Sequence, residues 1–121
     1  MCGLVAVLKP FKTSGSELKK LVKSSLDLIK HRGPDGSNTW VNSDLRVGLG
    51  HVRLAIVDIE SGAQPMALDD GTTIAFNGEI YNYIELRKEL GIDSFNTTSD
   101  TEVILRAYKQ WGENCVDHLR G

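Results

Sequence analysis

The sequence opens with Met1-Cys2-Gly3-Leu4-Val5-Ala6-Val7-Leu8, a cysteine at the second position followed directly by a short apolar run. Such a run, ended here by Lys9-Pro10, predicts a buried strand from Gly3 to Leu8. If Met1 is removed, Cys2 carries both a thiol and a free α-amine, which in short peptides titrates near about pH 8. One residue could then supply a nucleophile and its base. The alternative is that Cys2 is a small hydrophobic residue without a chemical role.

A helix is expected after this strand, because Ser14-Gly-Ser-Glu17 has the spacing of a capping box. The apolar positions that follow have a roughly helical period: Leu18, Leu21, Val22, Leu26 and Ile29. Gly33-Pro34 cannot continue a helix, so we expect this one to end near His31.

Strands are expected in the middle of the chain. Leu45, Val47 and Leu49 alternate with polar or glycine residues, which predicts a strand with one apolar face and glycines where backbone or ligand approaches closely. Two further short apolar runs cover residues 54–57 and 72–76. A loop over residues 58–65 separates these runs, and Asp69-Asp70-Gly71 indicates a turn.

Helices are expected again after Asn77-Gly78. Asn82 with Glu85 predicts a capped helix that ends at Gly91, and Ser99 with Glu102 predicts another that ends at Gly112. The apolar stripe predicted for the second helix is Val103, Ile104, Ala107, Tyr108 and Trp111. A last short helix would hold Cys115, Val116 and Leu119. The whole chain, residues 1–121, is therefore expected to be one α+β domain with a largely antiparallel sheet.

The composition excludes several classes of function. Fourteen Lys and Arg residues against sixteen Asp and Glu residues give a net charge of −2, which argues against a nucleic-acid partner. The apolar run at the start is far shorter than the roughly 20 residues that span a bilayer, so no membrane association is expected. Two cysteines form no disulfide framework, which is typical of a cytoplasmic protein.

Four segments could contribute to a site, and each has a structural alternative. Arg53, flanked by apolar residues, could bind a carboxylate through two parallel hydrogen bonds; its structural alternative is an ion pair with Asp58. Asn77-Gly78 offers a side-chain amide and a main-chain N–H to an oxyanion, or is a plain turn. Asp100 follows the Ser99 cap, where the helix N-terminus would stabilise any carboxylate. His31 and His51 could join Cys2 and Cys115 in a metal site, but their spacing argues against it.

Taken together, the whole chain resembles the glutaminase domain of the class II (N-terminal nucleophile) glutamine amidotransferases, and within them the glutamine-hydrolysing asparagine synthetases. The residues that carry the resemblance are Met1-Cys2-Gly3, His31-Arg-Gly-Pro-Asp35, Gly50-His-Val-Arg-Leu-Ala-Ile-Val-Asp58, Gly62-Ala-Gln-Pro-Met66, Phe76-Asn-Gly-Glu-Ile-Tyr-Asn-Tyr83 and Thr98-Ser-Asp-Thr-Glu-Val-Ile-Leu105.

The resemblance implies a role for each matched residue. Cys2 would be the nucleophile that attacks the side-chain amide of glutamine, and Asn77 with the Gly78 N–H would form the oxyanion hole. Arg53 would hold the α-carboxylate of L-glutamine, and Glu79 and Asp100 its α-ammonium. Main-chain groups of Leu54, Ile56 and Val57 would line the same pocket.

The resemblance also implies a larger setting. The fold would be the αββα sandwich of N-terminal-nucleophile hydrolases, of which this chain would hold only the N-terminal part. No cofactor or metal is expected in this domain, whereas ATP and Mg would act in a synthetase domain or subunit that uses the ammonia. A homodimer is also possible, because uncovered strand edges and apolar faces favour pairing with another chain. The competing hypothesis is a truncated, non-catalytic module of the same fold that binds glutamine or a protein.

Overall fold

The fold is α+β, and its sheets are antiparallel. The structure, a computed structural model, describes residues 2–54, 62–91 and 95–121. It divides into two compact units: residues 1–55, 63–65 and 75–77 form the first, and residues 56–62, 66–74 and 78–121 the second. No helix in the described part of the chain is long and apolar enough to cross a membrane.

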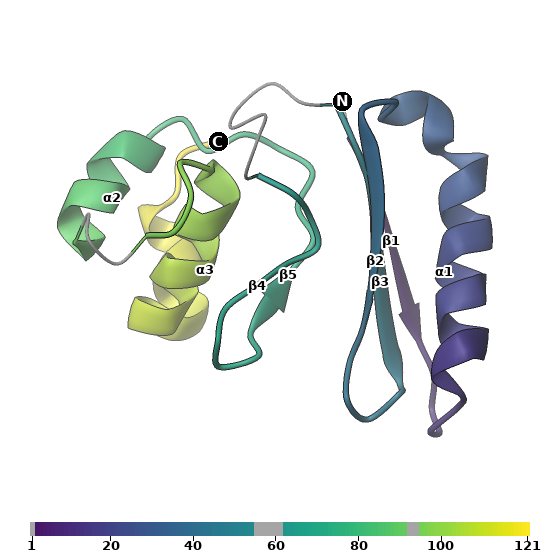
Figure 1. Cartoon of the computed structure of the whole chain (residues 1–121). Coiled ribbons are helices and arrows are strands. Elements are labelled where there is room, and N and C mark those ends of the chain that lie inside the picture. The colour runs from purple at the N-terminus through teal and green to yellow at the C-terminus, as the bar shows by residue number, and fades with distance from the viewer. Residues whose placement is uncertain (1, 55–61, 92–94) are drawn as a thin grey trace. The chain divides into compact units, whose positions relative to one another are not determined.

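The first unit is a three-stranded antiparallel sheet with one helix along a face (Figure 1). Strands β1 (Gly3–Leu8), β2 (Gly36–Val41) and β3 (Val47–Arg53) lie in the order β1-β3-β2, with Gly3 opposite Val52 and Gly36 opposite Arg53. Strand β1 has the predicted bounds. Strand β2 was not predicted, and only Trp40 and Val41 are apolar in it.

Helix α1 (Gly15–Leu28) confirms the predicted helix and is followed by the short 3-10 helix η1 (Lys30–Arg32). Ser14 caps it, accepting a hydrogen bond from the Glu17 amide at 3.1 Å. Its buried residues pack against the sheet in a core of Val22, Leu26 and Val52, joined by the half-buried Val5, Val7 and Ile29.

One prediction about the central strand was wrong and another is confirmed. Leu45 is not in β3 but in the loop before it, with a φ of 56°, where Asn42 Oδ1 accepts hydrogen bonds from the Arg46 and Val47 amides. The glycines of β3 do allow a close approach, as predicted, and α1 is the element that approaches. A Cβ atom at Gly50 would lie 2.5 Å from Val22 Cγ1 and 2.8 Å from Leu26 Cδ1, so the glycines allow α1 to pack closely.

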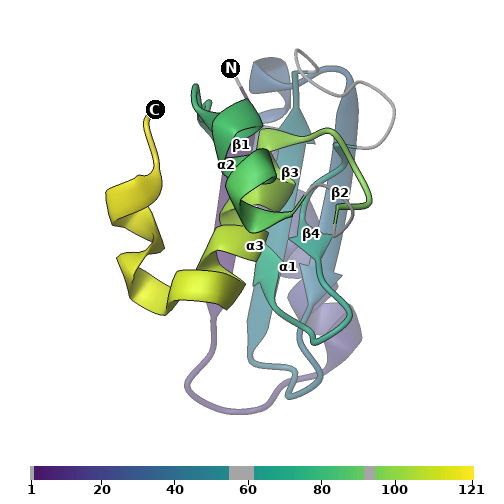
Figure 2. The ribbon, with the colours of Figure 1, turned by 90° about the vertical axis from the view of Figure 1, so that its left-hand side faces the viewer.

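In its described residues the second unit contains a two-stranded hairpin and three helical segments, some of which Figure 2 shows. Strands β4 (Met66–Ala67) and β5 (Thr73–Ile74) pair antiparallel, and the predicted turn at 69–71 joins them. The strand predicted over 72–76 is thus only two residues long. The apolar run predicted over 54–57 and the first half of the loop predicted over 58–65 lie largely outside the described residues, and Leu54 is not in a strand.

Helices α2 (Tyr83–Leu90) and α3 (Asp100–Trp111) pack together, and the 3-10 helix η3 (Gly112–His118) follows α3. Gly91 and Gly112 end α2 and α3 as predicted, both with positive φ. The predicted stripe on α3 is partly wrong, since Tyr108 is largely exposed and Leu105 is buried. In η3 Cys115 is buried, whereas Val116 is exposed.

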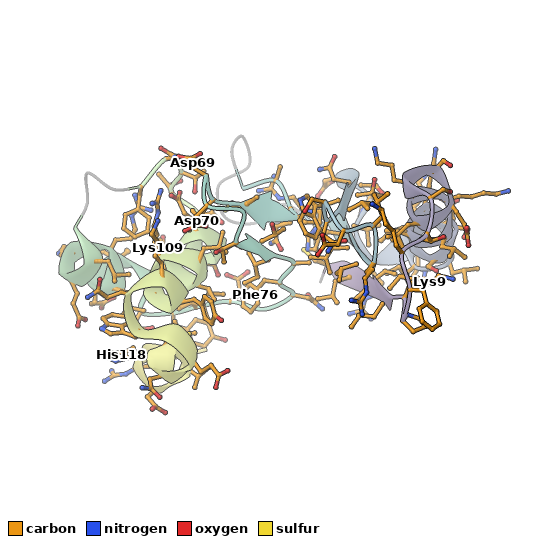
Figure 3. All side chains as sticks on the ribbon, turned by 90° about the horizontal axis from the view of Figure 1, so that it is seen from below. Lys9, Asp69, Asp70, Phe76, Lys109 and His118 are labelled. Atoms are coloured by element: carbon orange, nitrogen blue, oxygen red, sulfur yellow. The ribbon has the colours of Figure 1, made fainter. Side chains whose placement is uncertain are left out.

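The hairpin is tied to α3 by an ion pair. Lys109 Nζ lies 3.0 Å from Asp70 Oδ2, and Figure 3 labels both residues. Hydrogen bonding from the Thr72 amide, and then from Lys109, lowers the pKa of Asp70 to about 2. The Asp70 carboxylate is therefore charged at neutral pH and holds the turn against the helix.

Candidate functional site

The thiol of Cys2 lies at the start of β1 and is held by the main chain that follows β3. Its Sγ accepts a hydrogen bond from the Leu54 amide at 3.3 Å and donates to the Leu54 carbonyl oxygen at 3.5 Å. Cys2 is half-buried. The antiparallel register that pairs Gly3 with Val52 brings Cys2 to this position.

The segment after η1 supports the ends of these two strands. Arg32 Nε donates to the Cys2 carbonyl oxygen at 3.0 Å, and the Asp35 amide donates to the Arg53 carbonyl oxygen at 2.9 Å. A Cβ atom at Gly33 would overlap the main chain of Val52 and Arg53, so only glycine fits there. The motif His31-Arg-Gly-Pro-Asp35 therefore has a structural role that residue types alone did not indicate.

Arg53 is the last residue of β3 and is half-buried. Because strand side chains alternate between faces, Arg53 lies on the same face as His51 and on the opposite face from Val52, which packs against α1. Its predicted alternative partner, Asp58, lies outside the described residues.

Asn77 follows a short segment whose main chain is held on both sides. The Phe76 amide donates to Gln64 Oε1 at 2.6 Å, and the Phe76 carbonyl oxygen lies 3.1 Å from His51 Nε2. Asn77, Gly78 and Glu79 themselves are exposed. Asn77 thus presents an accessible amide at the end of a firmly held backbone.

The two acidic candidates lie in the second unit. Asp100 is the first residue of α3 and only 7% exposed, and its Oδ2 accepts a hydrogen bond from the Ile80 amide at 2.9 Å. Partial burial, and then the negative charge of Asp100, raise the pKa of Glu79. The charge of Asp100 thus acts on Glu79 and contributes, after burial, to its raised pKa.

Asn82 does not have the role predicted for it. Instead of capping α2, its side chain holds the end of the chain: Nδ2 donates to the His118 carbonyl oxygen and Oδ1 accepts from the Arg120 amide, both at 2.9 Å. The Tyr81 amide also donates to the Arg120 carbonyl oxygen, at 2.7 Å. Tyr81 and Asn82 directly follow Glu79 and Ile80 in the sequence. Their hydrogen bonds to the end of the chain therefore anchor the residues that come after Glu79.

Glu102 also differs from its predicted role as the second half of a capping box. Burial would raise its pKa, but hydrogen bonds from the Asn96 and Thr97 amides, the Thr97 hydroxyl and Arg106 outweigh it, and the pKa is lowered. Ser99 does cap α3, accepting from the Thr101 amide at 3.1 Å. The Glu102 carboxylate is therefore charged, and its hydrogen bonds to the amides of Asn96 and Thr97 hold the loop before Asp100 in place.

The predicted site residues divide between the units. Cys2, Arg53, Leu54 and Asn77 belong to the first unit, and Gly78, Glu79 and Asp100 to the second. The predicted main-chain contributors Ile56 and Val57 lie outside the described residues. Within the described ranges, no group of three or more His, Cys, Asp or Glu side chains could hold a metal ion.

Fold and site define an α+β domain with a cysteine thiol directly before its first strand, hydrogen-bonded to the residue that follows the arginine at the end of the neighbouring strand. The family described as "Glutamine amidotransferase domain" matches residues 1–121. The chain belongs to this family.

Its relatives include glutamine-hydrolysing asparagine synthetases. It is 47% identical over 126 residues to "Asparagine synthetase [glutamine-hydrolyzing] 3" of Bacillus subtilis (strain 168), and 43% identical over 122 residues to "Asparagine synthetase [glutamine-hydrolyzing]" of Zea mays. Each alignment covers 100% of this chain and 20% of the relative. The chain therefore spans about a fifth of the length of these proteins.

Proposed function

We propose that this chain is a glutaminase domain that hydrolyses L-glutamine to glutamate and ammonia through a thioester on Cys2. The observation that carries the proposal is the contact between the Cys2 thiol and the main chain of Leu54, one residue after Arg53. The proposed nucleophile, directly before β1, and a cation suited to a carboxylate, at the end of β3, thereby lie at the same end of one antiparallel sheet. The names of the relatives support glutamine as the substrate.

The chemistry needs only groups of this chain and water. Cys2 Sγ attacks the side-chain carbonyl carbon of glutamine, forming a C–S bond and a tetrahedral oxyanion, while the thiol proton passes to the base. Collapse of that intermediate breaks the C–N bond and releases ammonia, which takes a proton from the base. Water then attacks the thioester, breaks the C–S bond and releases glutamate. The base is the α-amine of Cys2, which is free only after Met1 has been removed.

The oxyanion would be stabilised by the Asn77 side-chain amide and the Gly78 N–H. Both residues are exposed and adjacent in the sequence, so both donors are accessible to the same small molecule. Donors that are already in place when the charge develops cost no reorganisation, and loss of one costs about 10²–10³ in rate.

Glutamine would be bound through its two charges. Arg53 would hold the α-carboxylate, with main-chain groups of Leu54, Ile56 and Val57 around it. Glu79 and Asp100 would hold the α-ammonium, and the raised pKa of Glu79 supports this assignment because an ammonium group would relieve the repulsion between the carboxylates. The assembly of both sets of residues into one pocket is part of the proposal.

The larger protein would use the ammonia. A synthetase domain or subunit with ATP and Mg would transfer it to aspartate to form asparagine, as the names of the relatives suggest. Within that protein we propose that this chain forms part of an αββα sandwich, needs no cofactor of its own and works in the cytoplasm. Two free cysteines, Cys2 and Cys115, are consistent with a reducing compartment. A homodimer is a further proposal.

The proposal is tested on the complete protein that contains this chain. We expect mass spectrometry to show that Met1 is absent, and a coupled assay to detect glutamate release from glutamine. Cys115→Ser is the matched control, because Cys115 is also free but is buried in η3, and it should leave the rate unchanged. Glutamine binding measured by calorimetry without any glutamate release would favour the non-catalytic binding module instead.

A further inference from the structure

The main chain of Phe76 is clamped from both sides by two buried polar side chains. Gln64 Oε1 accepts from its amide at 2.6 Å, and His51 Nε2 lies 3.1 Å from its carbonyl oxygen. His51 is 1% exposed and Gln64 8% exposed, and both belong to the same unit as Phe76. Phe76, labelled in Figure 3, is the residue directly before Asn77.

The contact defines the tautomer of His51. A carbonyl oxygen can only accept, so Nε2 carries the proton and Nδ1 does not. Nδ1 is buried and has no hydrogen-bond partner in the described part of the chain. Burial, opposed by the Phe76 hydrogen bond and assisted by the charge of Arg53, lowers the pKa of His51, so the ring is neutral at physiological pH.

Packing alone does not account for a histidine at this position. An unpaired buried nitrogen costs stability, and an aliphatic side chain on this strand would avoid that cost. The gain from the histidine is the hydrogen bond to Phe76. That bond ties the residue before Asn77 to β3, the strand that ends at Arg53 and continues to the Leu54 contact with Cys2.

We infer that His51 is a positioning residue for the oxyanion hole, and that it acts with Gln64 by fixing the Phe76 peptide so that the Asn77 amide keeps a constant place relative to the Cys2 thiol. The inference rests on the proposed function, in which Asn77 donates to the oxyanion. Cys2, His51, Gln64, Phe76 and Asn77 all lie in the first unit, so the path from donor to nucleophile is contained in one compact body.

The test compares two amide substitutions in the complete protein. The Gln side chain is long enough to put an N–H near the position of imidazole Nε2, whereas the Asn side chain is too short. We expect His51→Asn to lower kcat for glutamine hydrolysis by about 10²-fold, the effect of misplacing a group by about 1 Å. KM for glutamine should change little, because the oxyanion exists only after attack. His51→Gln should restore most of kcat.

Structural damage is separated from mispositioning by a control and a second measurement. Val22→Ala removes core volume under the same sheet without touching Phe76, and should lower stability but not kcat of the folded protein. Amide exchange of Phe76 and Asn77 should be faster in His51→Asn and return to the wild-type rate in His51→Gln.

Equal kcat in wild type and His51→Asn, or equal losses in the Asn and Gln variants, would overturn the positioning role. A parallel loss of kcat in Val22→Ala would overturn it as well. A wild-type protein that releases no glutamate contradicts the proposed function, so that failure is recognised before any His51 variant is compared.

Discussion

The Cys2 thiol and the Leu54 main chain are hydrogen-bonded in both directions, with Sγ 3.3 Å from the Leu54 nitrogen and 3.5 Å from its carbonyl oxygen. Leu54 directly follows Arg53, so the sulfur is held one residue away from the cation that we propose binds the α-carboxylate. The pairing of β1 with β3 therefore determines the distance between the Cys2 sulfur and the main chain of Arg53.

Cys2→Ala should abolish glutamine hydrolysis by the complete protein, a loss of about 10⁴-fold or more, because no other group can form the thioester. Synthesis supplied with free ammonia should continue, since ammonia bypasses that step. Parallel assays with glutamine and with ammonium chloride measure both activities. Equal loss of both would place Cys2 outside the glutaminase reaction.

Asp100→Asn should weaken glutamine binding by about 2–5 kcal/mol, as for other buried charge pairs that lose one partner. Asn keeps an oxygen that can accept from the Ile80 amide, so the helix start should survive while the charge is lost. Steady-state KM for glutamine and calorimetry check this effect.

Asp70→Asn is the matched control for Asp100→Asn, since it makes the same chemical change in the same unit at the exposed contact with Lys109. It should leave the affinity for glutamine unchanged. If Asp100→Asn also leaves it unchanged, Asp100 serves only to bind the Ile80 amide at the start of α3.

Glu79 should make glutamine binding pH-dependent. Its pKa is raised, so as the pH falls it gains a proton earlier than an ordinary carboxylate and the proposed ammonium site loses a charge. We expect kcat/KM for glutamine to fall as the pH is lowered through the pKa of Glu79, which gives the pH profile an acid limb. Glu79→Gln should remove this limb and lower kcat/KM at neutral pH.

The stability of the same variant should change in the opposite direction. Because the folded-state pKa of Glu79 lies above the unfolded one, its contribution to stability is lost as the pH rises through the folded value. Glu79→Gln should therefore unfold at a slightly higher denaturant concentration than wild type at neutral pH. Glu85→Gln, in the first turn of α2, is the control and should change neither kcat/KM nor the acid limb.

Local signals in the sequence predicted the elements that depend on local interactions. The Ser14 and Ser99 caps and the terminating glycines Gly91 and Gly112 are all confirmed, because each acts within one turn of its own helix. Strand β2 was missed because its first residues are polar and exposed, and only pairing with β3 makes it a strand. Such pairing has no local signature.

The predictions of the buried face of α3 and of the hydrogen-bond partners of Asn82 were wrong because both depend on contacts between residues distant in sequence. The first turns of α3 are buried on several sides, including Asp100, Thr101 and Glu102, so a single-stripe pattern could not describe that helix. Asn82 is a residue type that commonly caps a helix, but its side chain is hydrogen-bonded to the carbonyl of His118 and the amide of Arg120 instead of to the start of α2. The clamp on Phe76 also joins residues distant in sequence. The sequence singled out His51 only as a candidate metal ligand, and Gln64 only as part of a longer motif.

Asn82→Ala should release the segment after η3. The variant loses two hydrogen bonds, to the His118 carbonyl and from the Arg120 amide, and we expect a cost of about 1–2 kcal/mol. Urea unfolding gives the cost, and amide exchange at Arg120 locates it. Asn114→Ala, an exposed asparagine within η3, should cost much less. Equal costs would mean that the Asn82 contacts contribute nothing specific.

Gly50→Ala should destabilise the first unit by about 1–3 kcal/mol, the usual cost of overpacking a core. The added methyl group would lie 2.5 Å from Val22 Cγ1 and 2.8 Å from Leu26 Cδ1, so α1 has to move away from the sheet. Gly36→Ala, on the neighbouring strand β2, is the control: its methyl group meets only Arg53 Cβ, at 3.9 Å, and should be tolerated. Denaturant midpoints of the two variants measure the difference. If both variants unfold at the wild-type midpoint, the glycines of β3 do not determine how closely α1 packs, and another contact must set the spacing between helix and sheet.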